Sequence, residues 1–334
     1  MGWLKMTDPG RSVGLICRKG LGQAFLQLGL IDYFWEVDKG NRKSYQTIIE
    51  SLKSFEINYW LSPHTSARTA LFTWQIKAQK KISFKKFWNT LFFHQTIQFP
   101  KEWPEALRLL HLLKNKNAKL SQHLDSLNRP DQFTQKDDQS ALMPALSWAD
   151  PHQFLNQSLL QKKFEECKIA DRFPFQNSVV LFPGSVWATK MWKKEKFIVL
   201  GNEIVNNGHQ VLIMGGASEA ELGESITSQI PGAVNLCGKS NVLESLLILS
   251  KQKLVIGNDS SSSHMASLVG IPVVSAFGPT VLRFGYRPWG KSAKVFEVSD
   301  LDCRPCGAHG PKVCPLGHHN CMNKLNITYQ DLGI

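Results

Sequence analysis

From residue 179 onward, apolar segments of strand length alternate with segments of helical spacing. The strand candidates are Val179–Phe182, Gln210–Met214, Ala233–Leu236, Leu254–Gly257 and Pro272–Phe277. The helix candidates between them are Lys194–Asn207, Ala217–Gln229, Val242–Leu249 and Ser263–Val269. Strands and helices that alternate at this pitch form parallel sheets joined by helical crossovers. This half of the chain is therefore expected to form a doubly wound α/β domain that binds ligands at the carboxyl ends of its strands.

Two loops that follow these strands carry groups suited to phosphate. The first loop, 183–192, contains Ser185, Thr189 and Lys190. The second, 257–266, contains Asp259, the serine run 260–263 and His264. A loop that enters a helix presents unpaired N–H groups and the positive end of the helix dipole. A lysine beside such a loop neutralises charge on a departing diphosphate. Two such sites predict a ligand with a nucleotide diphosphate.

Each of these side chains also has a structural interpretation. Lys190 also fits the role of an ordinary surface lysine, and His264 that of a packed helix histidine. Asp259 is suited either to capping the following helix or to orienting a sugar hydroxyl or His264. Glu219 lies in the glycine-containing segment 214–221, which follows the strand candidate 210–214. It suits a ribose contact or the first turn of a helix.

The first half of the chain is also expected to contain strand–helix–strand units. Strand candidates are Val13–Cys17, Tyr33–Val37 and Ile57–Leu61, and Thr65 or Ser66 is placed to cap a helix over Ala67–Ala78. Residues 114 to about 140 are polar and predict an interdomain excursion or mobile loop. We place the domain boundary between about 150 and 175, which gives domains 1–160 and 175–325.

The net charge of +12 favours anionic partners. Basic residues concentrate at 77–88, where they are interleaved with aromatic residues; a solvated helix face and an anionic membrane surface are both consistent with this segment. No nucleic-acid-binding module is recognisable. There is no apolar run of about 18 residues and no signal-peptide core, so we expect a cytoplasmic protein.

Four of the seven cysteines, Cys303, Cys306, Cys314 and Cys321, cluster near His318 and His319. Their spacing is irregular for a structural zinc site, so adjacent free thiols are the preferred interpretation, with zinc as the alternative. An odd cysteine count argues against a disulfide framework. We predict no cofactor and no metal. There is no phosphate-binding P-loop and no nucleophile elbow, and the glycines at 20–22 are too few for a dinucleotide fingerprint. This argues against an ATPase and an ordinary dehydrogenase.

Taken together and in order, the segments 183–192, 257–266, 277–280 and 303–322 resemble the lipopolysaccharide heptosyltransferases of glycosyltransferase family 9. Weaker similarity extends to 17–22, 38–41 and 61–68. The resemblance implies a GT-B fold, with two Rossmann-like domains facing across a cleft. It also implies inverting transfer of heptose from ADP-heptose to the inner core on lipid A, without an essential metal.

By the same resemblance, each domain has its own ligand. Lys190 and Asp259 are the expected catalytic residues. The expected donor-binding residues are Ser185, Thr189, Lys190, Glu219, Ser240, Asp259, Ser260, Ser261 and His264. The expected acceptor-binding residues are His64, Ser66 and Arg68. The implied partners are ADP-heptose, a lipid A–core acceptor and, peripherally, the anionic inner membrane face, but no nucleic acid.

One feature of the family is not matched. Its members open with an apolar strand and a Gly-Asp loop whose aspartate serves as the base, whereas Val13–Cys17 resembles the family's second strand. The N-terminal domain is thus predicted to lack its first βα unit. Either the natural chain starts further upstream, which we favour, or this chain binds donor and transfers poorly. A nucleotide-sugar epimerase of the same fold and a non-catalytic sugar-nucleotide-binding protein are the alternative functions.

Overall fold

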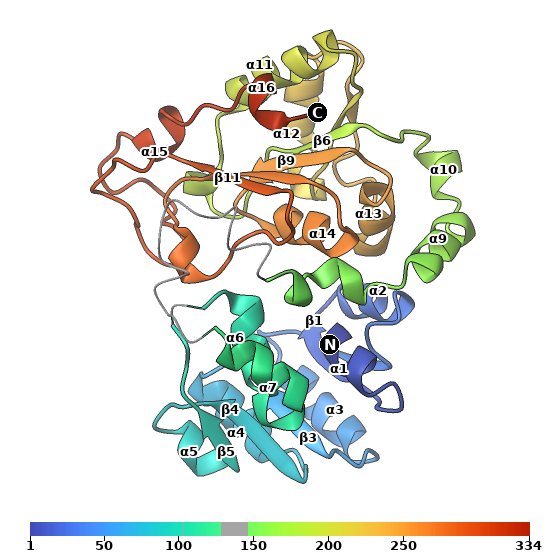
Figure 1. The fold of residues 1–334 in the computed structure, drawn as a ribbon, viewed down its shortest axis with the longest axis vertical. Helices are drawn as coiled ribbons and strands as arrows, with labels where there is room; N and C mark the ends of the chain where they lie inside the picture. The colour runs from blue at the N-terminus through green and yellow to red at the C-terminus, as the bar shows by residue number, and fades with distance from the viewer. Residues whose placement is uncertain (102, 128–145) are drawn as a thin grey trace. The chain divides into compact units, whose positions relative to one another are not determined.

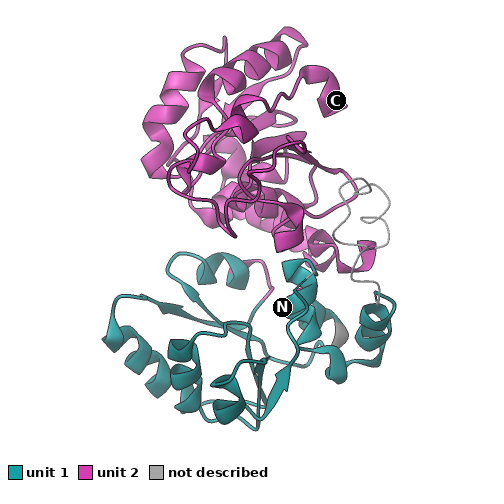
Figure 2. Cartoon of the chain, turned by 90° about the vertical axis from the view of Figure 1, so that its left-hand side faces the viewer, with its two compact units in different colours: residues 1, 3–26, 31–135 teal, residues 2, 27–30, 136–334 magenta. Residues whose placement is uncertain are grey.

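The computed structural model describes residues 1–101, 103–127 and 146–334, which divide into two compact units (Figures 1 and 2). Among these residues, the first unit comprises 1, 3–26, 31–101 and 103–127, and the second comprises 2, 27–30 and 146–334. The main change from one unit to the other falls outside the described residues. The domain limits 1–160 and 175–325 therefore stay predictions.

The second unit contains a six-stranded parallel sheet in the order β11-β10-β9-β6-β7-β8. Its strands are β6 (Val179–Phe182), β7 (Val211–Ile213), β8 (Val234–Asn235), β9 (Leu254–Asn258), β10 (Val273–Phe277) and β11 (Ala293–Glu297). This is the strand order of dinucleotide-binding domains. The chain winds outward in opposite directions from the adjacent strands β6 and β9, so the loops after these two strands flank the topological switch point. Ligands of doubly wound sheets bind at that point.

Helices cover both faces of this sheet (Figure 1). The crossover helices are α11 (Lys194–Asn206), α12 (Ala220–Thr227), α13 (Val242–Leu249) and α14 (Ser261–Val269). The shorter helices are η3 (Ser147–Ala149), η4 (Pro151–Phe154), α9 (Gln157–Glu166), α10 (Ile169–Arg172), η5 (Ala188–Lys190), η6 (Ala217–Glu219), η7 (Leu282–Phe284), α15 (Asn320–Asn323) and α16 (Tyr329–Leu332). All five predicted strands and four predicted helices of this half are confirmed, with small shifts at their ends. The edge strand β11 was not predicted, because its half-buried, charged sequence lacks a long apolar run.

A large core cluster of the second unit lies between the sheet and the helices α11, α12 and α16. Leu181, Ile213 and Ile256 from the strands meet Phe197 and Leu200 from α11, and all five are almost fully buried. The strands β6, β9 and β10 are buried along nearly their whole length, as expected for parallel strands with helices on both faces. This burial fixes where each strand ends and where its loop begins.

The first unit contains two separate parallel sheets, β1-β2 and β3-β4-β5. Its strands are β1 (Gly14–Arg18), β2 (Tyr33–Val37), β3 (Tyr59–Ser62), β4 (Lys80–Phe84) and β5 (Gln95–Ile97). Its helices are α1 (Gly2–Thr7), α2 (Gly22–Gln27), α3 (Arg42–Leu52), α4 (Ala67–Trp74), α5 (Asn89–Phe92), α6 (Glu105–His111), η1 (Lys114–Lys116) and α7 (Ala118–Asp125). The predicted strand–helix alternation is confirmed. The absence of a first βα unit stays a prediction.

The basic segment 77–88 is not a solvated helix face, and that interpretation is wrong. Residues 80–84 form β4, the central strand of its sheet, and Ile82 and Phe84 are core residues. Lys81 is 9% exposed, and its ammonium donates to the carbonyls of Thr73 (2.9 Å) and Trp74 (3.3 Å). These carbonyls end helix α4, where a cation is favourable. Burial lowers the pKa of Lys81.

The predicted polar excursion at 114–140 is wrong for its described part. Residues 114–125 contain η1 and α7, and Asn117 caps α7 by accepting from the backbone N–H of Leu120 (2.9 Å). Leu120 and Leu124 lie on one face of α7, Leu127 follows the helix, and all three are buried. Residues 128–140 lie outside the described part. Within the described ranges, no helix has the length and apolar character needed to cross a bilayer.

Replacing Lys81 with methionine is expected to destabilise the first unit. The stem would still pack, but two carbonyls at the end of α4 would lose a charged donor, a loss of about 1.5–3 kcal/mol. Urea unfolding followed by tryptophan fluorescence measures this change. Lys80→Met is the matched control, because the Lys80 side chain forms no hydrogen bond or ion pair within the described ranges. Equal stability of the two variants would contradict the capping role.

Candidate functional site

The candidate site is built around Asn258, the last residue of β9. Its side chain is fully buried, and its amide N–H groups donate to the carbonyls of Pro183 (2.8 Å) and Gly184 (3.2 Å). Its amide oxygen accepts from the backbone N–H of Trp192 (2.8 Å). One side chain thus holds both ends of the loop after β6 against the end of β9. The two loops of the switch point are locked together.

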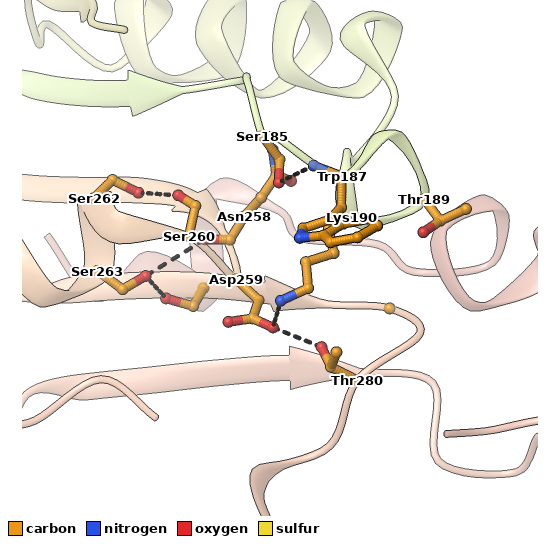
Figure 3. A network of polar contacts seen from close by, with 12 residues as sticks. Ser185, Trp187, Thr189, Lys190, Asn258, Asp259, Ser260, Ser262, Ser263 and Thr280 are labelled. Atoms are coloured by element: carbon orange, nitrogen blue, oxygen red, sulfur yellow. Dashed lines mark hydrogen bonds and ion pairs between the residues drawn. The ribbon is translucent and has the colours of Figure 1, made fainter. Parts of the chain in front are cut away.

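Lys190 and Asp259 form an ion pair inside this frame (Figure 3). The Lys190 Nζ lies 2.6 Å from Asp259 Oδ2, and the two side chains are only 9% and 6% exposed. Thr280, after β10, donates its hydroxyl to the same carboxylate oxygen at 2.6 Å. The capping alternative for Asp259 is wrong, since Ser260 is the N-cap of α14 and the Asp259 carboxylate faces Lys190. Asp259 Oδ1 accepts no hydrogen bond from a described residue.

The serine run divides into structural and available hydroxyls. Ser262 and Ser263 are buried, and Ser263 Oγ lies 2.6 Å from the hydroxyl of Ser275 on β10. Ser260 Oγ contacts Ser262 Oγ at 2.8 Å, and Ser261 is exposed at the first turn of α14. The first turn of this nine-residue helix therefore presents its N–H groups and Ser261 next to Asp259. Anion binding by this turn stays a prediction.

His264 lies one turn into α14 and its ring is exposed. Partial desolvation lowers the pKa of His264; the nearby Asp259 carboxylate opposes this effect and the Lys190 ammonium adds to it. Both charges are thus close enough to act on the imidazole. The packed-histidine alternative does not fit an exposed ring, and a neutral imidazole is favoured at pH 7.

The loop after β7 also reaches the site, through Glu219. The carboxylate of Glu219 accepts from the backbone N–H of Gly216 at 2.6 Å. Its Oε1 lies where a Cβ on Gly184 would be, only 1.5 Å from that position. A side chain at 184 is therefore incompatible with this carboxylate. Ser240, after β8, contacts the hydroxyl of Ser245 at 2.8 Å and lies before the N-cap of α13.

Ser185 and Thr189 both belong to the loop after β6, but their hydroxyls have different partners. The Ser185 hydroxyl accepts from the backbone N–H of Trp187 at 3.3 Å. The buried Thr189 hydroxyl donates to the carbonyl of Pro311, and the Thr189 carbonyl lies 2.7 Å from His319 Nε2. Thr189 therefore ties the loop after β6 to the segment around Pro311.

The segment 303–321, which carries four cysteines, contacts the loop after β6. Cys321 is buried, while Cys314 Sγ accepts from the backbone N–H of His319 at 3.4 Å. Burial and the neighbouring thiols Cys303 and Cys314 raise the pKa of Cys306. Among the described residues, no group of three or more histidine, cysteine or acidic side chains is placed to hold a metal ion. The absence of a bound metal stays a prediction.

The predicted acceptor residues lie in the first unit. Ser66 caps α4, since its hydroxyl accepts from the backbone N–H of Thr69 (3.3 Å), which confirms the predicted cap. His64 and Arg68 are exposed. Arg68 lines a groove of about 340 Å³ with Lys39, Arg42, Tyr45, Leu71 and Phe72. No acidic side chain in the described ranges pairs with these three cations, so the groove suits an anionic ligand with an apolar part.

Sequence reasoning did not single out Asn258 and Thr280 as functional. Both lie within segments quoted for the family resemblance: Asn258 is the last residue of the buried strand β9, and Thr280 lies in the loop after the buried strand β10. A polar residue at the carboxyl end of a parallel strand was the available signal. Which loop each side chain contacts follows only from strand order.

The sequence model described as glycosyltransferase family 9 (heptosyltransferase) matches residues 46–312. The lipooligosaccharide heptosyltransferase 2 of Campylobacter jejuni (serotype O:6) is 31% identical over 189 residues, covering 52% of this chain and 58% of that protein. The match thus spans a little over half the length of this relative.

Two solved structures have the same fold. The Escherichia coli ADP-heptose lipopolysaccharide heptosyltransferase II aligns with a TM-score of 0.66 at 18% identity, covering 96% of this chain and 91% of that chain. An Escherichia coli heptosyltransferase solved with ADP gives a TM-score of 0.64 at 14% identity, covering 87% and 85%. The predicted α/β class and GT-B fold are confirmed by these matches.

Asn258→Ala is expected to destabilise the second unit and loosen the site. It would leave two carbonyls and one N–H buried without a partner, at about 1–3 kcal/mol each. Asn258→Asp should be comparably destabilised, because a carboxylate cannot donate to the two carbonyls. Urea unfolding measures both variants, with the exposed Asn207→Ala as the control. Wild-type stability of Asn258→Ala would refute the role of this amide.

Proposed function

The chain belongs to glycosyltransferase family 9, the heptosyltransferase family, and we propose on this premise that it transfers heptose from ADP-heptose to the inner core of lipopolysaccharide, with inversion. The observation that carries the proposal is the buried Lys190–Asp259 pair beside the first turn of α14. A departing diphosphate requires positive charge and hydrogen-bond donors, and this strand edge offers both. The ADP in the structure of a similar protein supports an adenine nucleotide as the donor's carrier.

In the proposed reaction, an acceptor hydroxyl oxygen attacks the anomeric carbon of heptose. The bond from that carbon to the β-phosphate oxygen breaks, its electron pair stays on ADP, and the hydroxyl proton passes to a base. The Lys190 ammonium has three N–H groups. It can therefore donate to Asp259 and still donate to a phosphate. Those donors and the N–H groups of α14 stabilise the charge that develops on ADP. Asp259 Oδ1 is left to accept from a sugar hydroxyl.

The other residues that we expect to bind ADP-heptose divide between its diphosphate and its nucleoside. We assign Ser185, Ser260, Ser261 and His264 to the diphosphate; Thr189 would join them once its hydroxyl leaves the Pro311 carbonyl. Glu219 and Ser240 follow β7 and β8, on the other side of β6 from β9, and are assigned to the nucleoside.

For the acceptor, we propose the groove of the first unit that Arg68 lines. Lys39, Arg42 and Arg68, which form no ion pair with another described residue, suit the acidic groups of a lipid A–core acceptor, and Tyr45 and Phe72 offer an apolar wall. His64 and Ser66 lie at the start of α4, next to Arg68. The Ser66 hydroxyl is engaged in capping, so Arg68 is the principal acceptor residue of the three.

We also propose peripheral contact with the anionic inner membrane face, through exposed apolar and basic side chains of α4, of α5 and of the loop before α5, which we call the apolar–basic patch. The patch comprises Trp74, Phe87 and Leu91, which are 64%, 83% and 72% exposed, and the exposed Lys85 and Lys86. The two helices contact each other. Large exposed apolar side chains beside lysines suit the boundary between lipid head groups and acyl chains.

Lys190→Ala is expected to lower transfer of heptose from ADP-heptose to a truncated-core lipopolysaccharide by about 100-fold or more, because the leaving group would lose its cation. Product formation by mass spectrometry measures the rate. Lys193→Ala, at an exposed lysine before α11, is the control and should keep the wild-type rate. Unchanged transfer by Lys190→Ala would remove the assigned role of this residue.

The same assay separates the alternatives. An epimerase would convert the donor without any acceptor, and a binding protein would bind ADP-heptose without turnover. Either outcome for the wild-type protein would overturn the transferase proposal.

The double variant Phe87→Ser/Leu91→Ser is expected to bind vesicles containing phosphatidylglycerol several-fold more weakly, because it removes two insertable side chains. Co-sedimentation measures the bound fraction, and binding should also fall with added salt. Val313→Ser is the control, since Val313 is 77% exposed but lies in the second unit. Equal vesicle binding by the double variant and wild type would rule out this surface.

A further inference from the structure

Three aromatic side chains from separate loops of the second unit form a continuous surface. The rings of Trp187 and His309 are stacked, with centroids 6.3 Å apart and planes 10° from parallel. The ring of Tyr286 lies 5.9 Å from that of His309 at 40°. His309 and Tyr286 are exposed and Trp187 is half-buried, so the surface is accessible. We call these three residues the aromatic surface.

The loop that carries His309 is held in place by contacts with the candidate site. Gly310 has a φ of +73°, and a Cβ there would lie 2.8 Å from Pro279 Cγ, so only glycine fits without strain. The backbone N–H of Cys306 donates to the carbonyl of Pro279 at 2.9 Å. Thr189 binds the carbonyl of Pro311 on the other side. The position of His309 is therefore fixed before any ligand binds, which reduces the entropy cost of binding.

One member of the aromatic surface, Trp187, lies in the loop after β6, which also carries Lys190. The backbone N–H of Trp187 donates to the hydroxyl of Ser185, and Trp187 precedes Lys190 by one turn of η5. Figure 3 shows the indole of Trp187 beside the side chain of Lys190 in this view. A group attached to a diphosphate at Lys190 would thus meet this surface.

Strand order indicates whether the aromatic surface faces the nucleoside or the sugar of the ligand. Glu219 and Ser240 follow β7 and β8, on one side of β6. Tyr286 follows β10, and the loop of His309 contacts Pro279 just after β10, on the opposite side. If the diphosphate lies at the switch point between β6 and β9, its nucleoside and its sugar extend to opposite sides. The sugar then lies on the side of the aromatic surface.

We propose that Trp187, His309 and Tyr286 bind the six-membered ring of the donor sugar by stacking against its C–H face, and so determine which sugar is accepted. This inference rests on the proposed function, because it requires a sugar on the diphosphate. A sugar ring has hydroxyls at its edge and an apolar C–H face. Aromatic side chains bury such a face, and a few polar groups then set its orientation. Asp259 Oδ1, on the carboxylate that pairs with Lys190, is suited to that role.

The test compares calorimetric titrations with ADP and with ADP-heptose. Trp187→Ala and His309→Ala should bind ADP with wild-type affinity but ADP-heptose about 3- to 10-fold more weakly. Trp187→Phe should restore most of the loss because it keeps a ring. Val186→Ala is the matched control: Val186 is 97% exposed and adjacent to Trp187.

Each outcome separates this inference from the function on which it rests. If wild type binds neither ligand, the proposed function fails. If wild type binds both ligands and the alanine variants bind ADP-heptose equally well, only the aromatic surface is refuted. If Trp187→Ala and His309→Ala weaken ADP as much as ADP-heptose, the rings do not act on the sugar and the proposal is overturned.

Discussion

The candidate site depends on one buried amide, that of Asn258. Three hydrogen bonds from this side chain join the end of β9 to both ends of the loop after β6. Because β6 and β9 are neighbours at the switch point of the sheet, this connection sets the distance between the two loops that carry charge. Lys190 and Trp187 lie on the loop after β6, and Asp259 and the first turn of α14 directly follow β9.

The Lys190–Asp259 pair is costly to bury and is better explained by function than by stability. Desolvation of two charges offsets much of their attraction, and an apolar pair of similar volume is often at least as stable. Thr280 supplies one further hydrogen bond to the carboxylate, and the lysine retains spare donors. A ligand phosphate would use those donors. The Lys190 ammonium therefore lies where water is largely excluded, and electrostatic stabilisation of a ligand is strong in such surroundings.

How far the sequence predicted the structure depended on how apolar each segment is. The strands β6, β9 and β10 are buried on both faces, so they are uninterrupted apolar runs followed by polar loop residues. In contrast, β4 contains Lys80 and Lys81, and its strand was missed because the Lys81 stem packs inside while its ammonium reaches helix carbonyls. Helix α7 was missed because only Leu120 and Leu124 give it an apolar face.

The sequence by itself determined the α/β class, the five strands β6 to β10 of the second unit and the residues that lie at their carboxyl ends, because these follow from local apolar patterns. Only the tertiary structure decided which of these residues meet. Strand order brings the loops after β6 and β9 together, turns Asp259 toward Lys190 instead of toward its own helix, and sets His309 against Trp187. Such pairings join residues far apart in the chain, and no local pattern encodes them.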